Sequence, residues 1–212
     1  MPCFRHNRGN NDYQLRITDK NGQFIKELLP VDPKSKVLHG LGQNFYVYDG
    51  KLNVFPHFSN TIFSITPDST TQRYHFYFGD YHFPDDEIFQ KKEYNSQAIM
   101  SEIMNNSYVR LMAPYETDEH LLVKYYVKRQ VLLGIYNKKK HTAINLDPEM
   151  VIDSLHLGTF PVPIGFNHNE FIGQLTLDIQ QKNRIMIPEL QKLMADYSED
   201  SNPILIFYSL RS

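Results

Sequence analysis

Short runs in which apolar and polar residues alternate fill most of the sequence, and turn residues separate them. In the first run, 13–19, Leu15 and Ile17 alternate with polar neighbours, and a second run covers 23–29. Asn21-Gly22 between them tolerates the positive φ angles of a tight turn. A period of two places every other side chain on one face of a strand. The pattern therefore predicts a β-hairpin with one buried face.

The next stretch carries four such runs in about forty residues. Strands are predicted at 45–48, 52–58, 61–66 and 73–78. Asp49-Gly50, Ser59-Asn60 and Pro67 to Ser69 supply the turns between them. Connections this short force neighbouring strands to pair antiparallel. The stretch is therefore predicted to be a four-stranded meander.

Strand runs recur through the rest of the chain, with two helical insertions predicted at 96–105 and 188–197. The predicted strands are 108–112, 121–127, 131–136, 142–146, 163–166, 171–177 and 203–210. The longer turns between them include Tyr115 to His120 and Asn137 to His141. The last run is continuously apolar, which is typical of a strand buried on both faces.

The recurrence of strand clusters predicts an all-β fold of antiparallel four-stranded meander blades. Four strands form one propeller blade, and a blade needs neighbours to bury its two faces. A β-sandwich explains the local pairing equally well but gives no reason for clusters of four. We therefore predict a partial β-propeller of about three and a half blades over 13–212, preceded by a polar N-terminal tail, 1–12. The blade-like units are 13–30, 36–80, 107–147 and 152–212.

Composition supports a folded domain and disfavours two classes of partner. Hydrophobic residues make up 41% of the 212 residues and aromatic residues 13%, enough for a buried core. The net charge of −2 gives no general attraction to nucleic acid, and Lys138 to Lys140 are expected to be a solvated turn. No apolar stretch approaches the length of a bilayer span, and no signal peptide is recognised. One cysteine, Cys3, excludes an intrachain disulfide.

Candidate catalytic and metal-binding residues do not form a recognisable motif. Nine histidines include His57, His75 and His82 on or beside one predicted blade, where only the turns could bring them together. Acidic clusters at 85–87, 116–119 and 199–200 lie in presumed loops, whereas glycosidase chemistry needs two carboxyls at a fixed separation. We predict no catalytic residue, no metal site and no cofactor.

A binding role does not require a catalytic motif. Loops and inner strands of a propeller can place aromatic and polar groups around a concave site. Five residues are the candidates for ligand binding on this basis: His57, Tyr94, Arg110, Tyr115 and His168.

Several short sequence segments resemble those of a known family. Pro56 to Ile65 and Tyr74 to Gly79, with Ile164-Gly165-Phe166, Pro188-Glu189-Leu190 and Asn202 to Leu205, resemble the six-bladed β-propeller proteins of Bacteroides-type bacteria. The resemblance covers about 13–212 and implies an exported protein, periplasmic or a lipoprotein of the outer membrane. It also implies that the chain is the C-terminal half of a propeller. Half a ring leaves edge strands and one blade face exposed, so self-association is expected.

These observations favour a non-catalytic propeller that binds a glycan, peptide or protein partner. A carbohydrate-active hydrolase or lyase with its site in the propeller channel is the second hypothesis. A structural assembly component is the third.

Overall fold

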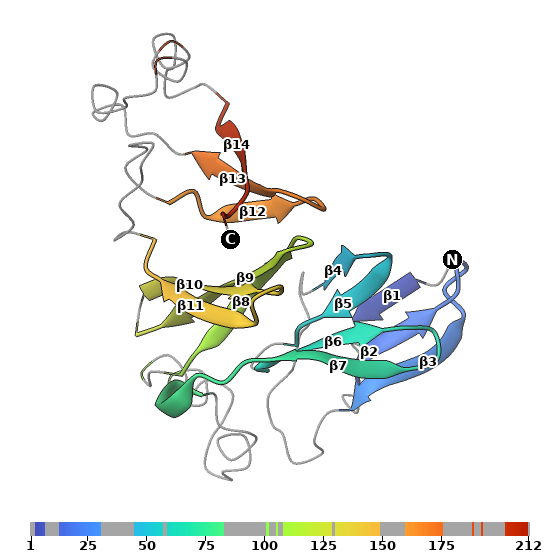
Figure 1. The fold of residues 1–212 in the computed structure, drawn as a ribbon. Coiled ribbons are helices and arrows are strands. Elements are labelled where there is room, and N and C mark those ends of the chain that lie inside the picture. Colours follow the sequence, from blue (N-terminus) through green and yellow to red (C-terminus); the bar gives the residue numbers. More distant parts are fainter. Residues whose placement is uncertain are drawn as a thin grey trace. The chain divides into compact units, whose positions relative to one another are not determined.

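The computed structural model describes residues 3–6, 13–30, 45–56, 59–82, 101, 105, 108–128, 130–148, 160–175, 188, 192 and 202–211. The elements whose bounds lie within these ranges are strands β1 to β14 and one short 3-10 helix, η1 (Gly79–Tyr81). The strands form four antiparallel sheets (Figure 1). The predicted all-β class is confirmed.

The first sheet joins β1 (Cys3–His6), β2 (Tyr13–Thr18) and β3 (Phe24–Pro30) in chain order. Strand β1 lies in the segment predicted to be a polar tail, and it pairs with β2 from Cys3↔Thr18 to His6↔Leu15. Four residues of that segment therefore form a paired strand. The reason is that backbone N–H and C=O groups can pair with a neighbouring strand even where the side-chain pattern gives no strand signal.

The hairpin between β2 and β3 forms where Asn21-Gly22 predicted it. Gly22 has a φ of 83°, in the left-handed region that favours glycine. The Asp19 carboxylate accepts hydrogen bonds from the backbone N–H groups of Asn21 and Gln23, both at 2.8 Å. The side chain therefore holds the turn from inside, as short polar residues do in Asx turns.

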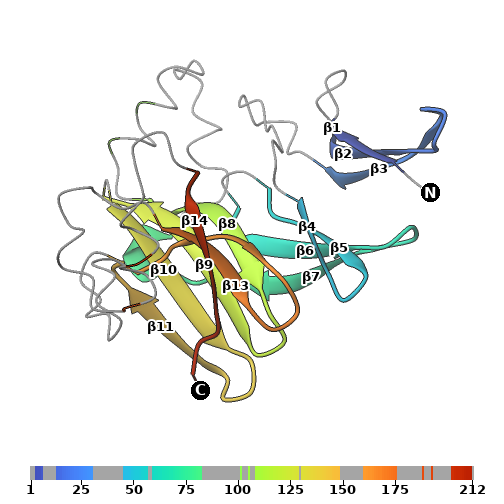
Figure 2. The same cartoon turned by 90° about the horizontal axis from the view of Figure 1, so that it is seen from above.

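The second sheet is the four-stranded meander that the sequence predicts. It joins β4 (Phe45–Tyr48), β5 (Lys51–Val54), β6 (Thr61–Ile65) and β7 (Thr70–His75) in chain order, which can be followed in Figure 2. Asp49 and Gly50 have φ angles of 49° and 67°, as a tight hairpin turn requires. Strand β7 begins earlier than predicted and ends at His75, so the residues that follow it leave the ladder.

The third and fourth sheets contain the remaining strands. In the third, β8 (Arg110–Glu116), β9 (His120–Val127), β10 (Gln130–Asn137) and β11 (Thr142–Leu146) lie in chain order. In the fourth, β12 (Pro163–Phe166), β13 (Phe171–Leu175) and β14 (Ile204–Tyr208) do the same. Strand β8 extends to Glu116, so Tyr115 lies in a strand, and only the residues after Glu116 form the predicted turn.

Apart from β1, the strands of each sheet fall inside one of the four predicted units. The propeller and the β-sandwich both use meander sheets of this kind, so the propeller stays a prediction.

The chain folds into two compact units, Met1–Ala113 with Tyr125–Gln130, and Pro114–Lys124 with Val131–Ser212. In unit 1, Leu15 and Leu29 of the first sheet pack against Val54 and Ile65 of the second. In unit 2, strands β9 and β10 pack against Phe171 of β13 through Leu122, Leu133 and Ile135. Each core is therefore formed between the faces of two sheets, which supplies the burial that one sheet cannot give itself.

Strand β14 is buried on one face only, contrary to the prediction from its apolar run. Tyr208 packs into the core of unit 2, whereas Leu205 is 50% and Phe207 is 55% exposed. The alternation follows from the pleat, because successive side chains point to opposite faces of the sheet. A continuous apolar run thus does not by itself show that both faces are covered.

The two predicted helices fall mostly outside the described residues. Ser101 and Asn105 are helical, and the Asn105 amide donates to the Ser101 hydroxyl at 3.3 Å. Pro188 and Lys192 are helical as well. Within the described ranges, no helix has the length and hydropathy that crossing a bilayer requires.

Candidate functional site

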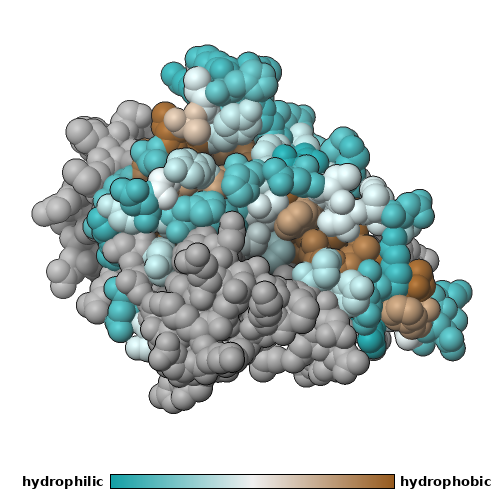
Figure 3. Space-filling model, turned by 90° about the horizontal axis from the view of Figure 1, so that it is seen from below, coloured by the Kyte–Doolittle hydropathy of each residue, from teal (hydrophilic) through white to brown (hydrophobic). Residues whose placement is uncertain are grey.

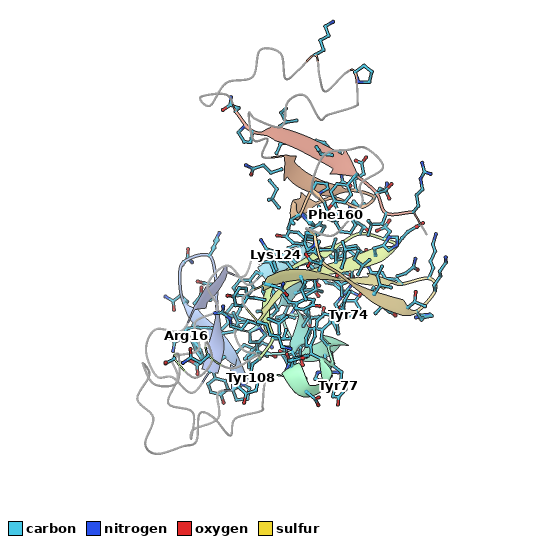
Figure 4. All side chains as sticks on the ribbon, turned by 90° about the vertical axis from the view of Figure 1, so that its left-hand side faces the viewer. Arg16, Tyr74, Tyr77, Tyr108, Lys124 and Phe160 are labelled. Atoms are coloured by element: carbon cyan, nitrogen blue, oxygen red, sulfur yellow. The ribbon has the colours of Figure 1, made fainter. Side chains whose placement is uncertain are left out.

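The segment that follows β7, Phe76–His82, turns aromatic side chains alternately inward and outward. The Phe76 and Phe78 rings stack with centroids 6.2 Å apart, and Phe78 lies 5.2 Å from the Tyr125 ring of β9. Tyr77, between them, is 81% exposed. Figure 4 shows Tyr77 beside the short helix at the end of this segment. The two phenylalanines therefore anchor a segment whose tyrosine faces water.

His82 links the rings of Tyr77 and His75. The His82 ring centroid lies 5.8 Å from that of Tyr77 and 5.8 Å from that of His75. Of the three histidines that the sequence placed on this blade, the structure thus brings His75 and His82 together, and His57 lies outside the described residues. We call His75, Tyr77, Tyr81 and His82 the aromatic platform.

Buried polar groups hold the histidines of the platform. Asn60 and Thr61 are 5% and 9% exposed. The Thr61 hydroxyl and His75 Nδ1 are 2.9 Å apart. The Asn60 amide nitrogen lies 3.2 Å from Nδ1 and 3.1 Å from Nε2 of His82. Ring orientations fixed by such neighbours lose little conformational freedom when a ligand binds.

Backbone hydrogen bonds fix the segment at both ends. The Phe76 N–H donates to the Asn60 carbonyl at 2.8 Å, and the Val109 N–H donates to the Tyr81 carbonyl at 2.8 Å. The His82 N–H closes η1 on the Gly79 carbonyl at 3.0 Å. The platform is therefore mounted on a segment that is tied to the sheet rather than on a free loop.

A lysine completes the platform. Lys128, in the turn after β9, places Nζ 2.5 Å from the Tyr81 hydroxyl and 4.3 Å from the centre of the Tyr81 ring. Tyr81 is 39% exposed, and Lys128 is exposed. The positive charge is attracted to the negative face of the aromatic ring, so it is held in place without a carboxylate.

A second polar group, in unit 2, occupies the ends of β8, β9 and β10. We call Glu116, Glu119, His120, Asn137, Lys138 and Lys139 the charged hairpin cluster. The Glu116 side chain is completely buried, and Lys138 Nζ lies 2.7 Å from its carboxylate. Lys138 also donates to the Thr117 carbonyl at 2.6 Å. A buried carboxylate needs this pairing because its desolvation is costly.

His120 and Asn137 form the neutral part of the charged hairpin cluster. Asn137 Oδ1 accepts the backbone N–H groups of Lys139 at 3.0 Å and Lys140 at 2.8 Å. Its amide nitrogen therefore faces His120 Nε2, at 3.1 Å, and donates to it. Burial lowers the pKa of His120, and the positive charges of Lys138 and Lys139 lower it further against the opposing effect of Glu119. A neutral imidazole that accepts this bond at Nε2 carries its proton on Nδ1.

The rim of the charged hairpin cluster is exposed. Lys139 pairs with Glu119 at 2.5 Å, and this contact lowers the pKa of the Glu119 carboxyl. Across the turn, the Asp118 N–H donates to the His168 carbonyl at 2.9 Å. The described carboxylates Glu116 and Glu119 each have a lysine partner, so the arrangement ties turns together and does not present a pair of free carboxyls.

The structure places three of the five predicted ligand-binding residues, and each has different neighbours. Arg110 lies over the Tyr126 ring at 4.8 Å. Tyr115 packs against the core of unit 2, where burial raises the pKa of its hydroxyl. His168 is exposed, with Nδ1 3.9 Å from an Asp118 oxygen. His57 and Tyr94 lie outside the described residues, so the set of five stays a prediction.

Tyr77, Tyr81 and Lys128 are not among the candidate residues predicted from the sequence. Tyr77 could have been found from the aromatic run Tyr74 to Phe78, because a strand period of two places Tyr77 on the face opposite Phe76 and Phe78. No local pattern points to Lys128, because 47 residues separate it from Tyr81.

Figure 3 shows one face of the molecule, on which groups of hydrophobic residues lie among hydrophilic ones.

Among the described residues, no three His, Cys, Asp or Glu side chains come together as metal ligands would. His75 and His82 are two imidazoles without a third such ligand among the described residues. Structural metal sites of the tetrahedral kind use four protein ligands.

Meander sheets and an aromatic platform define the chain as an all-β protein with an exposed aromatic surface. The chain belongs to a family described as a domain of unknown function, DUF4934, whose model matches residues 3–209. No curated protein matches the sequence.

Among solved structures, the chain is similar to the crystal structure of a protein from Bacteroides fragilis NCTC 9343 that is described as a "Putative exported protein". The TM-score is 0.78 at 18% sequence identity. The match covers 98% of this chain and 61% of the other, so this chain spans less than two thirds of that protein's length. At this identity the likeness shows a shared fold.

Proposed function

We propose that this chain is a non-catalytic binding module and that its aromatic platform contacts a glycan, peptide or protein ligand. The observation that carries the proposal is the 81% exposure of Tyr77 on a segment anchored by Phe76, Phe78 and backbone hydrogen bonds. An exposed tyrosine offers a large contact area at a low entropy cost, because its ring has only two χ angles to fix. Such rings dominate many binding surfaces.

The proposal includes a propeller architecture and export. Meander sheets that pack in pairs through apolar faces are compatible with a propeller, and the recurrence of strand clusters along the chain favours it over a β-sandwich. The likeness to a protein titled as exported supports export from the cytoplasm, to the periplasm or as an outer-membrane lipoprotein. The resemblance of the sequence to six-bladed propeller proteins supports a ring of six blades.

Binding is preferred to catalysis because the described carboxylates of the charged hairpin cluster are paired with lysines. A glycoside hydrolase needs an acid and a second carboxylate facing a shared cleft. No observation on the described residues favours the enzyme or the structural assembly component over the binding module.

A glycan array, followed by titration calorimetry of the positive glycans, tests the proposal. We expect the Tyr77→Ala variant to bind its glycan at least about tenfold more weakly, as for a central aromatic contact. Phe24→Ala is the matched control, because Phe24 is 60% exposed and lies on the first sheet. Equal losses in both variants, or no binding to any glycan, peptide or protein probe, would refute the proposed role.

A further inference from the structure

We propose that the ligand of the aromatic platform is an acidic oligosaccharide, with a carboxylate or sulfate group bound by Lys128. This inference rests on the proposed function and adds the chemical class of the ligand. The observation behind it is the positive charge of Lys128 beside Tyr81.

Lys128 is a cation fixed beside an exposed aromatic ring. Its Nζ is held by the Tyr81 hydroxyl at 2.5 Å and by the Tyr81 ring at 4.3 Å. Among the described residues, no carboxylate lies within ion-pair distance of Lys128, whereas Lys138 and Lys139 each have one. An ammonium group has three N–H donors, so the bond to Tyr81 leaves two for a ligand.

The anchoring of Lys128 favours an anion over a neutral ligand. A surface lysine normally loses much of its side-chain freedom when it binds, which offsets its electrostatic gain. Here the contacts with Tyr81 restrict Nζ before any ligand arrives. A charge-assisted hydrogen bond to a carboxylate or sulfate is also stronger than one to a sugar hydroxyl.

The rest of the platform favours a sugar ring over an acidic peptide. A pyranose has a face of C–H groups that packs flat on an aromatic ring, and Tyr77 is an exposed ring of this kind. The His82 ring lies 5.8 Å from the Tyr77 ring, and the His75 ring lies 5.8 Å from that of His82. Both histidines carry ring nitrogens that can hydrogen-bond to hydroxyl groups. An acidic sugar combines the apolar face, the hydroxyls and the anion in one compact unit.

Asp80 opposes an anion. It lies between Gly79 and Tyr81 and is exposed, so its carboxylate repels a negative ligand through water. Removing this charge should therefore strengthen the binding of an acidic ligand, whereas Lys128→Gln should weaken it.

The experiment compares oligosaccharides that differ only in charge, by titration calorimetry with the full chain at low salt. The pairs are trigalacturonic acid and its methyl ester, sialyllactose and lactose, and sulfated and desulfated chondroitin fragments. We expect the acidic member of at least one pair to bind ten times or more tighter than its neutral partner. Lys128→Gln should remove this preference, Asp80→Asn should increase it, and Lys140→Gln, on an exposed turn of unit 2, should leave it unchanged.

Each result separates this inference from the proposed function. If acidic and neutral members bind equally and Tyr77→Ala weakens both, the binding module stands and the acidic ligand is refuted. A charge preference that persists in Lys128→Gln also refutes the inference. If only an acidic peptide such as hexaglutamate binds, and does so through Lys128, the sugar class is wrong. If none of these probes binds, both the inference and a glycan-binding role fail.

Discussion

Lys138 is the residue on which the buried charge of unit 2 depends. We expect Lys138→Met to lower the free energy of unfolding by about 3 kcal/mol, because it leaves the completely buried Glu116 carboxylate without its cation. Chemical denaturation measures the change. Lys140→Met is the control, because Lys140 is exposed.

The double variant Glu116→Gln/Lys138→Met distinguishes the lost pairing from lost packing. Removing both charges should restore part of the stability that the single variant loses. Equal stability of Lys138→Met and Lys140→Met would show that the Glu116–Lys138 pair contributes nothing.

His120 is expected to make the free energy of unfolding depend on pH. Its pKa is lowered in the folded state by burial and by Lys138 and Lys139, against Glu119, from a usual value of 6.5. The unfolded chain therefore binds the proton more readily, and stability should fall as the pH drops below about 6.5. Protonation would also place a second donor against the Asn137 amide.

Denaturation curves at several pH values test this linkage. We expect His120→Gln to show a smaller loss of stability between about pH 7 and 5 than the wild type. His141→Gln, an exposed histidine in a neighbouring turn, should keep the wild-type pH dependence. An unchanged slope in His120→Gln would contradict the assignment.

At the scale of elements, two glycines on neighbouring strands offer a matched test of packing in the fourth sheet. A Cβ at Gly173 would lie 2.9 Å from Pro161 Cβ and 3.1 Å from the Pro161 carbonyl oxygen. Gly173→Ala should therefore cost about 1–3 kcal/mol through overpacking. A Cβ at Gly165 would meet nothing closer than 3.7 Å, so Gly165→Ala should be nearly neutral in thermal unfolding.

At the scale of the whole molecule, exposed apolar residues of the fourth sheet favour self-association. Leu205 and Phe207 share the outward face of β14, and Ile164 of β12 is 55% exposed. A contiguous apolar face on a sheet is an association hazard. We expect the protein to associate in sedimentation velocity, and Leu205→Lys/Phe207→Lys to shift it toward monomer.

The control for self-association is Ile144→Lys, which changes an apolar residue of similar exposure, 59%, on β11. A wild-type protein that stays monomeric at high concentration would rule out the expected association. An equal shift in both variants would assign it to general hydrophobicity and not to the fourth sheet.

The sequence by itself determined the local elements. Alternating side chains and turn residues such as Asn21-Gly22 and Asp49-Gly50 act between neighbours in the chain, so β2 to β6 and β9 to β13 were predictable to within a few residues. The same local logic identified Leu15 and Ile17 as core residues, and both are buried. Strand β1, which pairs without a clear pattern of its own, was not predicted, and the bounds of β7 and β8 differ from the predicted ones.

Only the tertiary structure decided which faces are covered and which distant residues meet. The run 203–210 could not reveal that β14 has one exposed face, because coverage depends on other sheets. The pairing of Glu116 with Lys138 and of Tyr81 with Lys128 joins residues that lie far apart in the chain. Local periodicity determines which side chains lie on each face of a strand. Long-range packing determines which residues those side chains contact, and the contacts of the candidate site are of this long-range kind.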